Sequence, residues 1–541
     1  MNPVPRGLRR WLRGPVLVYY HPAYRVPLAA SVGAPSSPRR ADDALTWAMA
    51  LGVVAPEDVS VAPEISWDDA ALVHGEQYLA DLDQPEAVAR ILGADIARIP
   101  VREILETWRR AVGATVAAAR RVLRRPGRAV NLFGGFHHAE RDKGGGFCAL
   151  NDVAIAVACL RRDGVRGRIG IVDLDAHPPD GVVQILGDDP GIVIRSLSTA
   201  SAWTVPTPSA ADVVDARVPA GTTDDAYLAA VDALLVGLPP VEIALYLAGA
   251  DPLVGDKLGG LAVSEAGLRA RDRRVFEVLG RTPTVVVPAG GYADASWRVL
   301  AGTIAETAGD RTAVAPGFDP VHHRTRRVMR TLDPRDLGGD DEVLVTEEEL
   351  LGGLGAAPRS GEPRFLGYYT RHGLEHALTA YGYLSTLRRL GFADLAIELQ
   401  VGTAGAADRM RITADVAGAR EVLVDLAASI RPIDRHRTLF VEWLELRDPR
   451  APFATHRPRL PGQQRPGLGL AEETIQILVR AAERLGLDGV SFVPSHWHVA
   501  WMARDRFVAA DPVERGRLRA MSRAVAGMPL VEATALLAGP G

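Results

Sequence analysis

Residues 169–181 read Ile-Gly-Ile-Val-Asp-Leu-Asp-Ala-His-Pro-Pro-Asp-Gly, so a short apolar run ends in acidic and imidazole side chains. A run of this length that meets turn-forming residues is typical of a buried β-strand. The pattern recurs up to about residue 315, with strand-like runs at 129–133, 192–195, 243–248 and 284–288 and helical stretches at 102–123 and 263–279. Strands that alternate with helices predict an α/β domain whose parallel sheet is flanked by helices.

The chain has 541 residues, which is too long for one ordinary hydrophobic core, so we expect at least two domains. Residues 333–364 turn acidic and glycine-rich and are predicted to form a linker, with one short helix around 346–351. A helix at 374–390, several strand runs and further helices follow. The predicted organisation is a first domain at 1–332, a linker at 333–364 and a second, smaller α+β domain at 365–541.

Composition and charge restrict the class of protein. A formal net charge of −4 favours no polyanionic partner, so nucleic-acid binding is not expected. The two cysteines, Cys148 and Cys159, lie in apolar segments and predict no disulfide. The apolar run at 16–20 is too short for a signal-peptide core, and no segment is apolar enough to span a membrane. We expect a reduced, soluble, cytoplasmic protein, and the abundance of Ala, Gly and Arg favours a bacterial source.

Four polar clusters each stand at the end of a strand-like run. They read Gly-Gly-Phe-His-His at 134–138, Asp-Leu-Asp-Ala-His at 173–177, Ala-Gly-Ala-Asp at 248–251 and Ala-Gly-Gly-Tyr at 289–292. Each pattern is ordinary by itself, because an Asp-x-Asp pair or a Gly-Gly-Tyr turn is usually structural. The carboxyl ends of parallel strands, however, form one edge of a sheet, where ligands bind. The four clusters are therefore predicted to converge on one site.

The residue types in these clusters indicate a metal. In an extended segment Asp175 and His177 would point to the same side, and Asp251 can supply a third ligand from another strand. Two carboxylates and one imidazole leave an open coordination position, as a catalytic zinc site requires. Zinc would polarise an amide carbonyl and lower the pKa of a bound water.

Five further side chains are candidates for acid–base chemistry beside such a metal. The adjacent His137 and His138 could serve as general base and acid, and Asp173 and Asp180 are placed to hold the two imidazoles. Tyr292, on a glycine-rich turn, could donate its hydroxyl to the oxyanion that forms as water attacks.

Longer stretches around these residues resemble the histone deacetylase superfamily, which has the arginase/deacetylase fold. The matching motifs are Gly-Phe-His-His-Ala at 135–139, Gly-Gly-Gly-Phe-Cys-Ala-Leu-Asn-Asp at 144–152, Asp-Leu-Asp-Ala-His at 173–177 and Gly-Gly-Tyr at 290–292. The segment Gly-Asp-Lys-Leu-Gly-Gly-Leu-Ala-Val-Ser at 255–264 looks most like the class IV branch. The resemblance covers roughly residues 15–315 and implies a zinc-dependent amidohydrolase.

The resemblance also implies a role for each residue of the clusters. The zinc ligands of the family match Asp175, His177 and Asp251. His138, paired with Asp180, would be the general base. His137, paired with Asp173, would assist electrostatically, and Tyr292 would stabilise the oxyanion.

Further family sites match less directly. Gly146 would offer its backbone carbonyl to the substrate amide, and Phe147 would wall the acyl-amine tunnel. The structural monovalent-cation site of the family, a potassium site, would match Asp173, Asp175, His177, Ser196 and Leu197. Residues 198–209 depart from the usual tunnel rim, where Trp203 is either an aromatic wall or a core residue. The pair Pro178-Pro179 also departs from the family and predicts an altered loop shape with the chemistry retained.

The predicted activity is hydrolytic removal of acetyl or longer acyl groups from lysine side chains of proteins, because class IV members resemble long-chain deacylases. A deacetylase of small acylated amines such as acetylpolyamines is an alternative, although the acidic gatekeeper motif of that branch is not found. A catalytically silent acyl-lysine-binding protein is disfavoured because every proposed ligand and Tyr292 are present. An arginase-type site with two manganese ions is disfavoured because it would need further carboxylates near Asp251. The oligomeric state is left open.

The second domain contains one motif that suggests a ligand. Gln464-x-x-Gly467-x-Gly469 stands between a strand-like run at 438–446 and a helix at 471–485. It resembles the pyrophosphate loop of the GNAT-type acetyltransferases, which bind acetyl-CoA. An ordinary Pro-Gly helix start is the favoured interpretation. For His496 and His498, a hydrogen-bonded pair at a strand end is favoured over a metal site.

Overall fold

The computed structural model of the chain describes residues 16–25, 37–94, 99–200, 204–338, 363–403, 406–453 and 458–538. The chain divides into two compact units, Met1–His323 and Arg324–Gly541, which are treated separately below. Two predictions lie outside the described residues, namely the short helix around 346–351 and the role of Trp203.

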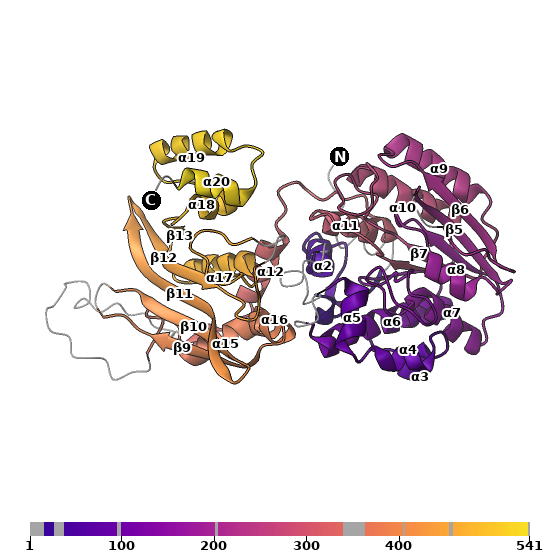
Figure 1. Cartoon of the computed structure of the whole chain (residues 1–541), viewed down its shortest axis with the longest axis horizontal. Coiled ribbons are helices and arrows are strands. Elements are labelled where there is room, and N and C mark those ends of the chain that lie inside the picture. The colour runs from indigo at the N-terminus through magenta and orange to yellow at the C-terminus, as the bar shows by residue number, and fades with distance from the viewer. Residues whose placement is uncertain are drawn as a thin grey trace. The chain divides into compact units, whose positions relative to one another are not determined.

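An eight-stranded sheet forms the centre of the first unit (Figure 1). Its order is β2-β1-β3-β8-β7-β4-β5-β6, and every neighbouring pair is parallel. The strands are β1 (Leu17–Tyr20), β2 (Val59–Val61), β3 (Arg128–Asn131), β4 (Ile169–Asp173), β5 (Ile192–Thr199), β6 (Asp212–Val218), β7 (Ile243–Leu247) and β8 (Thr284–Val287). The predicted α/β class with a parallel sheet is therefore confirmed.

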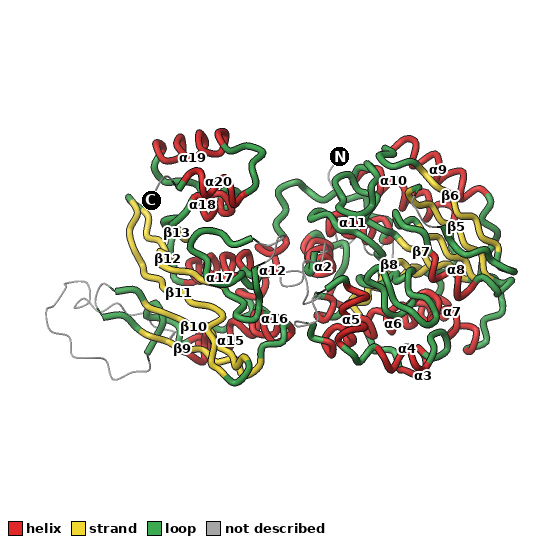
Figure 2. Tube along the Cα trace, in the orientation of Figure 1, coloured by secondary structure: helices red, strands yellow, loops and turns green. Residues whose placement is uncertain are grey.

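Helices cover both faces of this sheet (Figures 1 and 2). One layer contains α6 (Val101–Arg124), α7 (Asp152–Arg162) and α8 (Asp180–Leu186), and the other contains α2 (Arg40–Ala50), α9 (Asp224–Val236), α10 (Glu265–Leu279) and α11 (Ser296–Thr307). The remaining helices are α3 (Trp67–Ala70), α4 (Glu76–Asp81), α5 (Pro85–Leu92) and α12 (Pro320–Met329), of which α12 contains the residues at which the units divide.

Burial explains which strands the sequence reveals. All residues of β4, β7 and β8 are buried, because both faces of the sheet are covered there. Such strands read as continuous apolar runs. The edge strands β2 and β6 contain exposed and half-buried residues and have no comparable run, so the sequence does not predict them.

The second unit is built on a mixed five-stranded sheet of order β13-β12-β11-β10-β9. Its strands are β9 (Ala393–Gln400), β10 (Asp408–Val416), β11 (Ala419–Ile433), β12 (His436–Leu446) and β13 (Gly489–Phe492). All neighbours are antiparallel except β12 and β13. The helices are α13 (Pro334–Leu337), α15 (Arg371–Ala380), α16 (Tyr383–Arg389), α17 (Ala471–Arg484), α18 (Trp497–Ala503), α19 (Pro512–Ala524) and α20 (Leu530–Leu537).

One predicted helix of this unit is two helices. The single helix expected at 374–390 is interrupted between α15 and α16. Gly382 precedes α16 with φ +76°, a left-handed conformation that a continuous right-handed helix cannot contain. Among the described residues of the whole chain, no helix combines the length and the apolar character needed to cross a lipid bilayer.

Candidate metal centre

The four polar clusters follow four strands that are neighbours in the sheet. The order β3-β8-β7-β4 brings the loops after these strands to one edge. The loop after β3 carries His137 and His138, and the loop after β8 carries Tyr292. The loops after β7 and β4 carry Asp251 and Asp175. The predicted convergence at the carboxyl edge therefore follows from the strand order.

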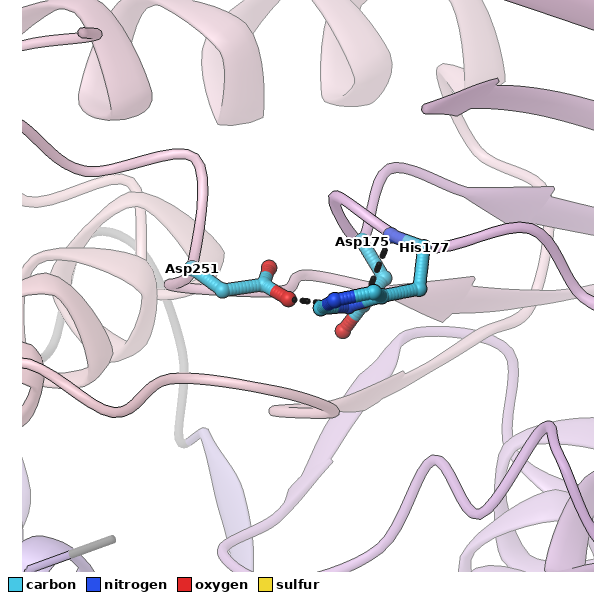
Figure 3. Close-up of side chains that lie close together, drawn as sticks. All are labelled: Asp175, His177 and Asp251. Carbon is cyan, nitrogen blue, oxygen red and sulfur yellow. Dashed lines mark hydrogen bonds and ion pairs between the residues drawn. The ribbon is translucent and has the colours of Figure 1, made fainter. Parts of the chain in front are cut away.

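Asp175, His177 and Asp251 form a compact group of possible metal ligands (Figure 3). One nitrogen or oxygen atom from each lies within 4.8 Å of the others. His177 Nδ1 lies 3.0 Å from Asp175 Oδ1 and 2.9 Å from Asp251 Oδ2. Both carboxylates are almost fully buried, so the group presents two acidic side chains and one imidazole inside the protein.

Backbone N–H groups hold the two carboxylates. Gly290 N donates to Asp175 Oδ2 at 2.6 Å, and Ala176 N donates to Asp251 Oδ1 at 3.0 Å. The extended segment predicted from Asp175 to His177 is not formed, so that prediction is wrong. The segment is a bend in which His177 N donates to Asp175 Oδ1 at 2.9 Å, and this bend turns both side chains toward Asp251.

The electrostatics of the group fit a divalent cation. Burial and the adjacent charge of Asp175 raise the pKa of Asp251 to about 7. Burial opposes the charge of His177, but its contacts with Asp175 and Asp251 raise its pKa to about 11. Two carboxylates thus compete for one positive partner in a buried site. A divalent cation would compensate both, and this donor set suits zinc.

Two histidine–aspartate pairs lie beside the ligands. His137 Nδ1 lies 2.8 Å from Asp173 Oδ2, and His138 Nδ1 lies 2.6 Å from Asp180 Oδ1. The two imidazole rings are 4.1 Å apart between centroids. Asp152 supports the loop that carries them, because its carboxylate accepts hydrogen bonds from the backbone N–H groups two and one residues before His137.

The two histidines differ in their charge preference. Burial lowers the pKa of His137, but the charges of Asp173 and Asp175 outweigh it and raise this pKa to about 9. Burial and the neighbouring His137 lower the pKa of His138 below its ordinary value. His138 is thus the neutral member of the pair and can accept a proton.

A cavity lined by several predicted substrate contacts joins these groups. Its lining includes His137, His138, Gly146, Phe147, Asp175 and Tyr292. The rings of Phe147 and Tyr292 are 5.7 Å apart between centroids. Phe147 has φ 67°, which is uncommon for a bulky residue and which functional sites often tolerate. A side chain at position 146 would collide with the His138 ring, so this glycine allows the backbone to approach it.

Other predicted residues occupy defined places. Asp173 and Ser196 are register partners on β4 and β5, and Leu197 follows in the same strand. The Ser196 hydroxyl donates to Asp215 Oδ1 at 2.7 Å. The monovalent-cation role of this region stays a prediction. Pro178 and Pro179 stand directly before α8, where a missing N–H removes no helical hydrogen bond.

Three residues with a bearing on the site were not foreseen. Arg271 donates to the backbone carbonyl groups of Leu174 and Gly249, which lie next to metal-ligand candidates. Arg40 donates to the carbonyl groups of Pro288 and Ala289, shortly before Tyr292. Asp256 accepts hydrogen bonds from the backbone around Tyr292. All these contacts involve backbone groups, which leave no signal in a sequence.

The Gln464–Gly469 motif of the second unit lies between β12 and α17, and α17 leads into β13, the parallel neighbour of β12. Asp448 N donates to Pro466 O at 2.8 Å, which fixes the loop beside the end of β12. The acetyl-CoA hypothesis stays a prediction that a calorimetric titration can test. The rings of His496 and His498 stack at 5.4 Å, and the only group of three possible metal ligands among the described residues is the one in the first unit.

Comparison with known proteins identifies relatives of the first unit. The family description "Histone deacetylase domain" matches residues 34–308. Histone deacetylase 2 of Arabidopsis thaliana is 37% identical over 257 residues, which are 44% of this chain and 65% of the plant protein, just under two thirds. An uncharacterized protein of Picosynechococcus is 35% identical over 288 residues, covering 51% of this chain and 92% of that protein. The crystal structure of an HDAC homolog from Aquifex aeolicus covers 55% of this chain and 84% of its own, at 22% identity and a TM-score of 0.46.

Proposed function

Because the chain belongs to the histone deacetylase family, we propose that its first unit is a zinc-dependent hydrolase that removes acetyl or longer acyl groups from lysine side chains of proteins. The observation that carries the proposal is the convergence of three ligand candidates, two histidine–aspartate pairs and Tyr292 on one sheet edge. This set contains every group that metal-assisted amide hydrolysis requires.

Asp175, His177 and Asp251 would hold the zinc ion. When bound, zinc supplies a Lewis acid for the acyl carbonyl and lowers the pKa of water. The choice of zinc rests on the donor set of one imidazole and two carboxylates, which leaves room for water and substrate.

The side chains around this group would move the protons. His138 has its Nδ1 against Asp180, so its Nε2 is the nitrogen that takes a proton from the attacking water. The Tyr292 hydroxyl would donate to the carbonyl oxygen as that oxygen becomes negative. The carbon–nitrogen bond then breaks and the proton passes from His138 to the departing amine. The amine takes up the remaining proton of the water as well, so the products are a carboxylate and an ammonium. His137, held by Asp173, would stabilise the developing negative charge.

The cavity supports an acyl group longer than acetyl. Besides the polar groups, its lining includes the apolar side chains of Leu92, Ile104 and Trp108. An acyl chain in contact with them would gain about 0.8 kcal/mol for each buried methylene. This apolar lining favours the preference for long acyl chains that the resemblance to class IV histone deacetylases implies.

The test is amine release from lysine peptides that carry acyl chains from acetyl to myristoyl. With zinc-loaded protein we expect turnover that rises with chain length, is strongly reduced in Tyr292→Phe and is lost in Asp175→Asn. Turnover that neither substitution changes would contradict the proposed site. Turnover only of small acylated amines would show that such amines, and not acylated proteins, are the substrates. Zinc-dependent peptide binding without any turnover would favour a catalytically silent acyl-lysine-binding protein.

A further inference from the structure

We propose that Asp256 is a positioning residue that holds Tyr292 in its reactive place relative to the metal-ligand loop. The inference rests on the proposed function, because it assigns a task in the same reaction. Asp256 is neither one of the residues that line the cavity nor one of the three ligand candidates, so its task is carried out through other residues.

The carboxylate of Asp256 joins two loops through four backbone donors. Oδ2 accepts hydrogen bonds from Tyr292 N at 2.6 Å and from Ala293 N at 2.8 Å. Oδ1 accepts from Leu258 N at 3.0 Å and from Gly259 N at 3.1 Å. Hydrogen bonds to a charged acceptor are about twice as strong as neutral ones, so this connection is firm.

One side of the connection leads to a metal-ligand candidate. Gly259 lies so close to Asp251 that a Cβ atom at position 259 would come within 1.9 Å of the Asp251 carbonyl oxygen. The backbone that Asp256 holds through Oδ1 is therefore packed directly against Asp251. A displacement of this segment would be transmitted to the ligand.

The other side leads to Tyr292. The segment that carries it is held at Gly290, whose N–H donates to Asp175 Oδ2 at 2.6 Å, and at Tyr292 and Ala293 by Asp256. The Tyr292 ring stands 6.5 Å from the His177 ring between centroids. Asp256 thus sets the distance between the tyrosine hydroxyl and the ligand group, and an error of about 1 Å in such a distance can cost about 100-fold in rate.

The experiment is a double-mutant cycle between Asp256→Asn and Tyr292→Phe. The Asn side chain has the same size as that of Asp256, but its NH2 group stands opposite one pair of backbone N–H donors. The substitution therefore weakens the connection between the two loops. We expect Asp256→Asn to lower kcat by about 10- to 100-fold with KM little changed. In the Tyr292→Phe background, where the hydroxyl is absent, it should lower the residual kcat by less than about threefold.

A second readout works without turnover. The same four proteins, loaded with zinc, are titrated with acetohydroxamate by calorimetry, because this chelator offers an oxygen to the Tyr292 hydroxyl. Asp256→Asn should weaken binding only when Tyr292 is present. A wild-type protein that binds the hydroxamate but hydrolyses no acyl-amine contradicts the proposed function, and the binding cycle then decides on Asp256 by itself.

Lys257→Gln is the matched control. It removes the exposed contact of Lys257 Nζ with Asp294 Oδ1 on the same two loops without touching the Tyr292 backbone, and it should leave kcat unchanged. Asp256→Glu, which keeps the charge and shifts it by one methylene, replaces the Asn variant if that variant does not fold. Equal losses in both tyrosine backgrounds, or no loss in either, would overturn the proposal.

Discussion

His138 and Asp180 are joined at 2.6 Å between Nδ1 and Oδ1, although they come from different loops and are 42 residues apart in the chain. Asp180 is the first residue of α8, and its side chain keeps 29% of its surface exposed, whereas the Asp173 partner of His137 is fully buried. The two pairs thus have the same chemistry in different surroundings. The more accessible pair is the one to which the proposed function assigns proton exchange with substrate.

Removing the charge of Asp180 should slow the reaction. Asp180→Asn no longer favours the His138 tautomer whose Nε2 is unprotonated, so we expect kcat to fall by about 10- to 100-fold. Steady-state kinetics on an acyl-lysine peptide measures this. Asp188→Asn, an exposed residue just after the same helix, is the control and should be silent. An unchanged kcat in Asp180→Asn would exclude the assigned pairing.

Metal content should follow the three ligand candidates. We expect one equivalent of zinc per chain in the wild type, and strongly reduced zinc in Asp251→Asn, measured by elemental analysis after dialysis. Zinc at 100 times its Kd should raise the free energy of unfolding by about 2.7 kcal/mol, and a chelator should remove this increment. Two equivalents of manganese per chain would instead indicate a binuclear centre.

Arg271 should be essential for the stability of the first unit. Its side chain and that of Asp272 are almost fully buried, with Arg271 Nε 2.9 Å from Asp272 Oδ1. Arg271→Met leaves the Asp272 charge uncompensated, so we expect a loss of roughly 3–5 kcal/mol in the free energy of unfolding. Urea unfolding measures it. Arg274 lies on the same helix as Arg271, and Arg274→Met, which removes a half-exposed ion pair with Asp232 of α9, should cost less than about 1 kcal/mol.

If Arg271→Met proves no more destabilising than Arg274→Met, the buried pair contributes no more to folding than an exposed pair does, which contradicts the prediction. Arg271 also donates to the carbonyl groups of Leu174 and Gly249. A variant that folds should therefore bind zinc more weakly, because these carbonyl groups lie next to Asp175 and two residues from Asp251. Competition with a chelator of known affinity measures that effect.

His74 should make the first unit sensitive to acid. Burial lowers the pKa of His74, whose Nδ1 donates to Arg141 O and whose Nε2 accepts from Asn151 N. As the pH falls below about 6.5, the His74 imidazole is protonated in the unfolded chain but stays neutral in the folded chain. The unfolded state then binds more protons, so stability decreases with falling pH in that range.

Thermal unfolding between pH 7.5 and 5 tests this prediction. His74→Gln should be less stable at pH 7.5 but should lose less further stability on acidification than the wild type. His372→Gln, at an exposed position of the second unit, should keep the wild-type pH dependence. Identical slopes for wild type and His74→Gln would show that another group causes the acid sensitivity.

Much of the site could be read from the sequence because of where the central strands lie. β4, β7 and β8 are buried on both faces, so each reads as an apolar run, and the polar residues that follow stand out. Asp175, Asp251 and Tyr292 were selected in this way. The helix predicted at 374–390 failed for the opposite reason, because its apolar pattern continues through Gly382 while the backbone turns there.

Only the tertiary structure decided which of these residues meet. The strands follow the chain as β3, β4, β7 and β8 but stand in the sheet as β3-β8-β7-β4, and this order places Asp251 beside Asp175 and Tyr292 near both. It also decided the tasks of Asp256 and Arg271, whose partners are backbone N–H and C=O groups. Almost every residue carries those groups, so no sequence pattern marks the ones that a side chain will bind. The residue types determined the available chemistry, and the packing of the sheet determined its geometry.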